Sequence, residues 1–148
     1  MGNVKSEVEL DQSSNPPKWE IKVRLIVSGF KDPPQSITAR LGCQPSETWL
    51  TGDRVLPQAA NVHHENGWVL RSPVDPFQTT LDQAVEALFT IIPNPAAFKS
   101  LPPEIDIEIG CAVFVHSEEW PYLGLSSKLV SRMAAIGASF DLDLYPPA

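Results

Sequence analysis

Two segments of the chain, residues 19–27 and 105–115, alternate apolar and polar side chains in the way that a half-buried β-strand does. Successive side chains on a strand point to opposite sides, so each segment has one face for a core and one for water. The residues assigned to the apolar faces are Trp19, Ile21, Val23, Leu25 and Val27 in the first segment and Ile105, Ile107, Ile109, Cys111, Val113 and Val115 in the second. Strands with one apolar face need helices laid against that face, which constrains the fold to packed layers.

Two helices are predicted between these strands. Thr80 and Gln83 form a capping box, and an apolar stripe follows until Pro93 stops the helix. The stripe consists of Leu81, Ala84, Val85, Leu88, Phe89 and Ile92. A shorter helix is expected after Asp32, which precedes Pro33 as an N-cap, and Gly42 can take the left-handed position that ends it.

The chain ends with a predicted helix that leads directly into a strand. Ser126 or Ser127 caps the helix, and Gly137 ends it. Its inward residues are expected to be Leu129, Val130, Met133 and Ile136. In the strand, Phe140, Leu142 and Leu144 then alternate with Asp141, Asp143 and Tyr145.

The middle of the chain gives weaker signals. Residues 47–52 are compatible with a short strand, and residues 54–61 resemble a loop interrupted by Pro57. Asn66-Gly67 is the preferred two-residue hairpin turn, which predicts antiparallel pairing of 62–65 with 68–72. In that register His63 faces Leu70 and lies on the same side as Trp68.

This order of elements predicts an α+β fold, a two-layer sandwich of a mainly antiparallel sheet with helices on one face. The first six elements have the order of a ferredoxin-like βαββαβ unit, to which a C-terminal helix and strand are added. We expect a single domain over residues 18–148, preceded by a flexible N-terminal leader at residues 1–17.

Charged residues on the polar faces of the strands suggest which strands are neighbours. Lys22 and Arg24 lie on the first strand, whereas the acidic pairs Asp106 with Glu108 and Asp141 with Asp143 lie on the later ones. Opposite charges on adjacent strands attract and like charges repel, so we expect the first strand beside at least one acidic strand.

Composition and charge exclude several classes of function. A net charge of −7 without a cluster of Lys or Arg opposes nucleic-acid binding. No apolar run approaches the roughly 20 residues that cross a bilayer, so no membrane contact is expected. The two cysteines, Cys43 and Cys111, are distant in sequence and predict buried thiols in a reducing cytoplasm rather than a disulfide.

No catalytic residue, cofactor or metal site is predicted. Ser126 and Ser127 are needed as caps and lack a nucleophile elbow, and His63 and His64 point to opposite sides of a strand. The paired acids have the spacing of a solvated sheet face or of an interaction surface. The candidate ligand-binding residues are His63, Trp68, Arg71 and Trp49, which would line a pocket between the sheet and residues 44–75.

Four parts of the chain together resemble the family called domain of unknown function 4279. They are residues 32–53 (DPPQSITARLGCQPSETWLTGD), 67–73 (GWVLRSP), 81–88 (LDQAVEAL) and 123–146 (LGLSSKLVSRMAAIGASFDLDLYP). The resemblance extends from Trp19 to Pro146 and implies a compact bacterial cytoplasmic domain. It carries over no site residues.

Two functions remain open at this level. The first is a non-catalytic protein-interaction module that binds a protein partner or self-associates. By analogy with other small bacterial families, an immunity protein that neutralises a toxin is one form of such a module. The alternative is a small enzyme or small-ligand-binding protein with a pocket around His63, Trp68 and Arg71.

Overall fold

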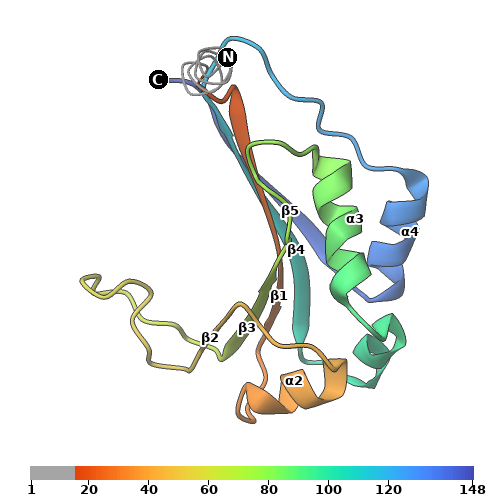
Figure 1. The fold of residues 1–148 in the computed structure, drawn as a ribbon. Coiled ribbons are helices and arrows are strands. Elements are labelled where there is room, and N and C mark those ends of the chain that lie inside the picture. Colours follow the sequence, from red (N-terminus) through yellow and green to blue (C-terminus); the bar gives the residue numbers. More distant parts are fainter. Residues whose placement is uncertain (1–15) are drawn as a thin grey trace, which may run out of the picture.

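The computed structural model describes residues 16–148 and shows one five-stranded sheet with its helices on one side (Figure 1). The strands are β1 (Trp19–Ser28), β2 (Glu47–Trp49), β3 (Gly67–Arg71), β4 (Asp106–Val115) and β5 (Ser139–Tyr145). The helices are α2 (Gln35–Leu41), α3 (Leu81–Ile91), the 3₁₀ helix η1 (Pro95–Ser100) and α4 (Ser127–Ala135). The predicted leader lies outside the described residues, apart from Pro16 and Pro17.

The sheet has the strand order β2-β3-β1-β4-β5. The β1–β3, β2–β3 and β1–β4 pairs are antiparallel, and β5 runs parallel to β4 at the edge. The first four strands and the helices α2 and α3 therefore form a βαββαβ unit of the predicted order, with β2 in place of the strand expected at residues 62–65. Helix α4 and strand β5 extend that unit beyond β4, which gives a mixed sheet in a two-layer α+β sandwich.

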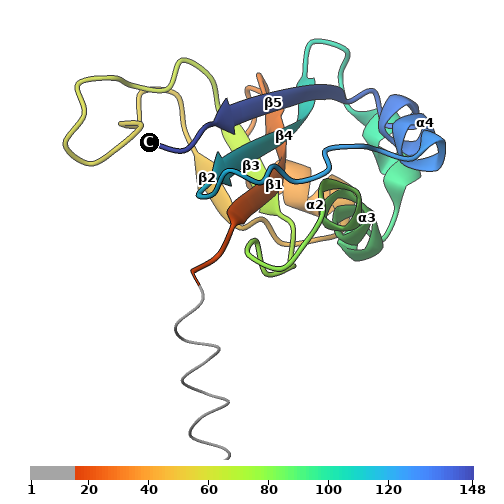
Figure 2. The same cartoon turned by 90° about the horizontal axis from the view of Figure 1, so that it is seen from above.

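The core lies between the helices and one face of the sheet (Figure 2). The alternating residues of β1 and β4 supply its sheet side, and all five predicted α3 residues from Leu81 to Phe89 are buried. The predicted capping box is present, because Thr80 Oγ1 accepts from Gln83 N at 3.1 Å and Gln83 Oε1 accepts from Thr80 N at 3.2 Å.

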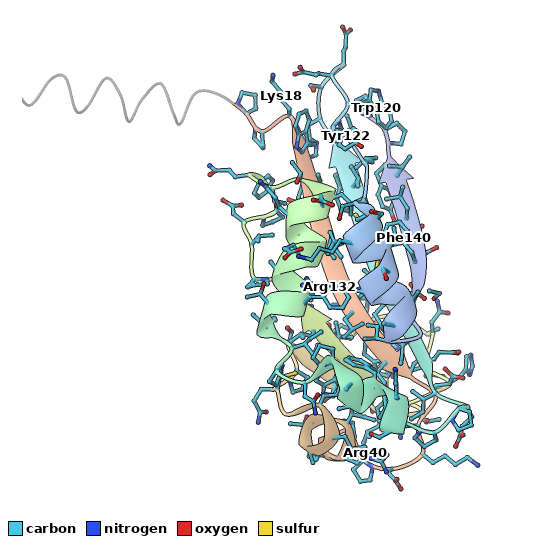
Figure 3. All side chains as sticks on the ribbon, turned by 90° about the vertical axis from the view of Figure 1, so that its right-hand side faces the viewer. Lys18, Arg40, Trp120, Tyr122, Arg132 and Phe140 are labelled. Atoms are coloured by element: carbon cyan, nitrogen blue, oxygen red, sulfur yellow. The ribbon has the colours of Figure 1, made fainter. Side chains whose placement is uncertain are left out.

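Helix α4 has the predicted ends but a narrower buried stripe. Ser126 is the N-cap, with its hydroxyl oxygen accepting from Leu129 N at 3.2 Å, and Gly137 is left-handed with φ of 74°. Leu129, Met133 and Ile136 are buried, but Val130 is 52% exposed, so its predicted inward orientation is wrong. The helix buries only one narrow stripe because β5 lies beside it rather than beneath it (Figure 3).

The start of α2 also differs from the prediction. Pro34, not Asp32, is the N-cap, and no side chain caps the helix. Pro34 already has helical φ of −55° and ψ of −25°, and Pro33 O accepts from Ser36 N at 2.9 Å. Two consecutive prolines therefore initiate the turn through the backbone, two residues later than an Asp32 cap requires. The predicted left-handed Gly42 is present, with φ of 73°.

The predicted hairpin at Asn66-Gly67 is wrong. Strand β3 pairs with β2 on one side and with β1 on the other, and neither Asn66 nor Gly67 has positive φ. Asn66 instead joins two loops: its side-chain oxygen accepts from Thr51 N at 2.8 Å, and its amide nitrogen donates to Asp32 O at 3.3 Å. Gly67 provides room for the Trp49 indole, which occupies the space that a Cβ would need. Long-range contacts thus override the local turn signal.

Other features agree with the sequence. Strand β1 lies beside the acidic strand β4, and the predicted short strand at residues 47–52 is β2. Cys43 and Cys111 are free thiols as predicted, but only Cys111 is buried, whereas Cys43 is partly exposed.

Within residues 16–148, none of the helices combines the length and the hydropathy of a membrane-spanning segment.

Replacing Asn66 with alanine is expected to destabilise the protein by about 1 to 3 kcal/mol, because Thr51 N–H and the carbonyl of Asp32 lose their shared partner. Asn61→Ala, at an exposed position of the same loop, is the matched control and should change stability by less than about 0.5 kcal/mol. Chemical denaturation measures both values. Equal effects of the two substitutions would show that Asn66 does not join the loops.

Candidate functional site

The sheet face that points away from the helices is open over most of its area (Figure 1). A groove of about 540 Å³ runs along it, between the segment that follows β3 on one side and β5 on the other. That segment continues along β1 beyond the end of β3, since Ser72 N donates to Val23 O at 2.9 Å and Ile21 N to Pro76 O at 2.8 Å. Gly110 and Ala112, on β4, form a floor of small residues.

The strand register orders the charges across this groove. One row reads Arg71 on β3, Arg24 on β1, Gly110 on β4 and Asp141 on β5. The next row reads Lys22, Ala112 and Asp143. Neighbouring strands lie about 4.8 Å apart. In each row the backbone of the β1 cation is therefore about 10 Å from that of the β5 aspartate, with a small residue of β4 between them. We call these the two charge rows.

Most of the charges in the two rows have no ion-pair partner. Arg71 pairs with Glu47 at 2.8 Å and Lys22 with Glu20 at 3.2 Å. Within residues 16–148, Arg24, Asp141 and Asp143 take part in no ion pair. Arg24 also lies directly opposite Arg71, an arrangement of like charges that costs stability. The groove therefore has charge available for a ligand or partner.

Aromatic side chains close one end of the groove. Phe114 on β4 and Tyr145 on β5 stack with ring centroids 4.6 Å apart and planes 8° apart. The ammonium group of Lys22 lies 5.6 Å from the Phe114 centroid, within the range of a cation–π contact. This end of the groove thus offers an apolar surface beside the two charge rows.

Two titratable groups near the groove have perturbed pKa values. Burial raises the pKa of Glu108, and the nearby Asp141 carboxylate raises it further, while Arg24 acts in the opposite direction. Burial, with a contribution from Asp143, raises the pKa of Cys111 to about 12. Since the thiolate is the nucleophilic form, the Cys111 thiol is unreactive at neutral pH.

The structure does not bring the four sequence-predicted ligand residues into one pocket. Trp68 is fully buried on the helix side, where its indole donates to Thr38 Oγ1 at 3.0 Å. His63, in the loop between β2 and β3, stacks on Trp49, the last residue of β2, with ring centroids 4.2 Å apart. Neither residue lines the groove. Arg71 alone lines the groove. The predicted ligand-binding role of the four residues stays a prediction.

Sequence reasoning identified the members of the charge rows, but not their alignment. Lys22, Arg24, Asp141 and Asp143 were recognisable as outward residues of alternating strands. Their placement in rows depends on Gly110 and Ala112 lying between them, which follows only from the strand order and register. Among the described residues, no group of three or more His, Cys, Asp or Glu side chains could hold a metal ion.

A second hollow, of about 410 Å³, lies on the helix side between α3, η1 and α4. Two of its three charged residues, Arg132 and Glu86, pair with each other at 3.4 Å, and Arg132 also lies over the Phe89 ring; the third is Lys99. Because Arg132 and Glu86 satisfy each other, the open-face groove is the better candidate site.

Glu108→Gln is expected to raise the melting temperature at pH 7 and to leave it unchanged below the ordinary glutamate pKa of about 4.3. A raised folded-state pKa means that the native state favours the protonated acid. The corresponding stability is present at low pH and is lost as pH rises toward the raised pKa. Calorimetry at both pH values tests this, with Glu118→Gln in an exposed loop as the control for the loss of one charge. A decrease in melting temperature at pH 7 would contradict the assignment.

Comparison with known proteins supports the resemblance seen in the sequence. No curated protein matches the chain, and no solved structure matches it. The family model described as "Domain of unknown function (DUF4279)" matches residues 19–147, which include every strand and helix of the described structure. The chain therefore belongs to the DUF4279 family.

Proposed function

We propose that this protein is a non-catalytic interaction domain that binds a protein partner on its open sheet face. The two charge rows are the observation that carries the proposal. They present separated positive and negative charge on a rigid sheet, and electrostatic complementarity of this kind gives an interface its specificity and register. A partner segment with acids aligned to Arg24 and Arg71 and bases aligned to Asp141 and Asp143 would be matched to the face.

Two features of the face support this proposal. Arg24 and Arg71 lie opposite each other, and the repulsion between them lowers the stability of the fold. Arrangements that lower stability are expected at functional sites. The Phe114–Tyr145 pair adds an aromatic surface, the type of side chain that is enriched at protein interfaces. Toxin neutralisation by an immunity protein, in a bacterial cytoplasm, is one setting in which such a domain would act.

A second candidate function is the binding of a small zwitterionic ligand in the groove. A volume of about 540 Å³ lies within the range of small-molecule sites. This alternative replaces the pocket expected from the sequence, since only Arg71 of that set borders the groove.

Reversal of single charges in the rows tests the first proposal. The assay measures binding to the product of the neighbouring gene, first by thermal shift and then by calorimetry. Arg24→Glu and Asp141→Lys should each weaken binding at least about tenfold, because each leaves a partner charge facing a like charge. Lys128→Glu makes the same charge change as Arg24→Glu at an exposed site on α4, and it should leave binding unchanged.

The outcomes separate the two candidate functions. Binding at the open face would be contradicted if all three variants weakened binding equally, or if none of them changed it. Stabilisation by a zwitterionic metabolite that is lost in Arg24→Glu, without any protein partner, would favour the small-ligand function.

A further inference from the structure

The two edges of the sheet differ in how open they are. Strand β2, at one edge, has three residues. Strand β5, at the other, has seven residues, and no strand within residues 16–148 pairs with its outer side. Seven residues span about 23 Å of backbone, and the N–H and C=O groups that point away from β4, those of alternate residues, are available to another chain.

Strand β5 also exposes its apolar row. Phe140, Leu142 and Leu144 are 37%, 36% and 46% exposed, although their alternation predicts a strand with a buried face. They pair with Ile109, Cys111 and Val113 of β4 and so lie on the helix side of the sheet. Figure 3 shows β5 at the side of α4, with Phe140 on the strand that the helix leaves uncovered. The apolar face of the sheet therefore extends to β5, where no helix of the described structure covers it fully.

The other side of β5 is acidic. Asp141 and Asp143 point to the open face, because they pair with Gly110 and Ala112. An added strand would thus meet apolar side chains on one side of the sheet and carboxylates on the other.

These carboxylates oppose pairing with a second copy of the chain. In a two-fold antiparallel dimer centred on Leu142, Asp141 of one copy would face Asp143 of the other. Centring the pair on either aspartate would place that residue opposite itself. Like charges directly opposite destabilise a strand pair, so the edge is better matched to a basic strand than to itself.

We infer that the outer edge of β5 binds an extended protein segment in which apolar residues alternate with Lys or Arg. The segment adds a strand to the sheet: its backbone hydrogen bonds to β5, its apolar residues cover Phe140, Leu142 and Leu144, and its basic residues pair with Asp141 and Asp143. This surface shares Asp141 and Asp143 with the groove but lies along the outer edge of β5, away from the floor at Gly110 and Ala112. Strand addition there is a mode of binding beyond the proposed function.

A short synthetic peptide of alternating valine and lysine is the probe. It should bind the full chain and slow hydrogen exchange of the β5 amides, while the amides of β2 exchange as before. A matched peptide with glutamate in place of lysine should bind at least about tenfold more weakly, because both carboxylates of β5 then face like charges. N-methylation of alternate peptide nitrogens on the bonding side should abolish binding.

A double substitution, Asp141→Lys with Asp143→Lys, should reverse the preference between the two peptides. Circular dichroism establishes that this variant is folded, and the comparison of peptides on the unaltered protein does not depend on it. Equal affinity for both peptides, protection at β2 instead of β5, or a dimer in sedimentation with β5 amides protected in the absence of peptide would overturn the inference. Arg24→Glu alters the groove and leaves the β5 edge intact, so the failure of one proposal is distinguishable from the failure of the other.

Discussion

The antiparallel pairing of β1 with β4 determines which residues form the core and which face the groove. All ten residues of each strand take part, from Trp19 opposite Val115 to Ser28 opposite Asp106. Because side chains alternate along both strands, this one register places an apolar row toward the helices and a polar row toward the open face. A slip of one residue would turn over the strand that moves, and would bring Arg24 into the core if β1 moved or Glu108 if β4 moved. Unpaired charge is costly there. The same pairing therefore fixes the core and the groove.

Local chemistry made much of the fold predictable. The capping box at Thr80 and Gln83, the cap at Ser126 and the left-handed Gly42 and Gly137 each depend on residues close in sequence. Predictions failed where distant residues decide the outcome. Asn66-Gly67 is a strong turn signal, but Asn66 bonds to Thr51 at the far end of its own loop and to Asp32 in the loop before α2, and Gly67 accommodates Trp49. The prediction that Val130 points inward was wrong for a related reason. How much of a helix is buried depends on the elements that pack against it, and the sequence of the helix alone does not specify them.

For the candidate site, too, the sequence indicated the residues but not their relative positions. The sequence indicated which residues face outward, and it correctly predicted a basic strand beside an acidic one. The groove also requires Gly110 and Ala112 between the two kinds of charge, which depends on β5 lying parallel to β4 in one register. Strand β5 is where the two proposed surfaces meet: its acids border the groove, and its outer edge is open. A partner bound there would complete a layer that α4 leaves unfinished.

The β1–β4–β5 register aligns cations and carboxylates across small residues, and cross-strand nuclear Overhauser effects in solution measure that register. Backbone protons of Gly110 should contact those of Arg24 on one side and of Asp141 on the other. Contacts displaced by one residue on β1 or β5 would point Arg24 or Asp141 toward the helices and would refute the alignment.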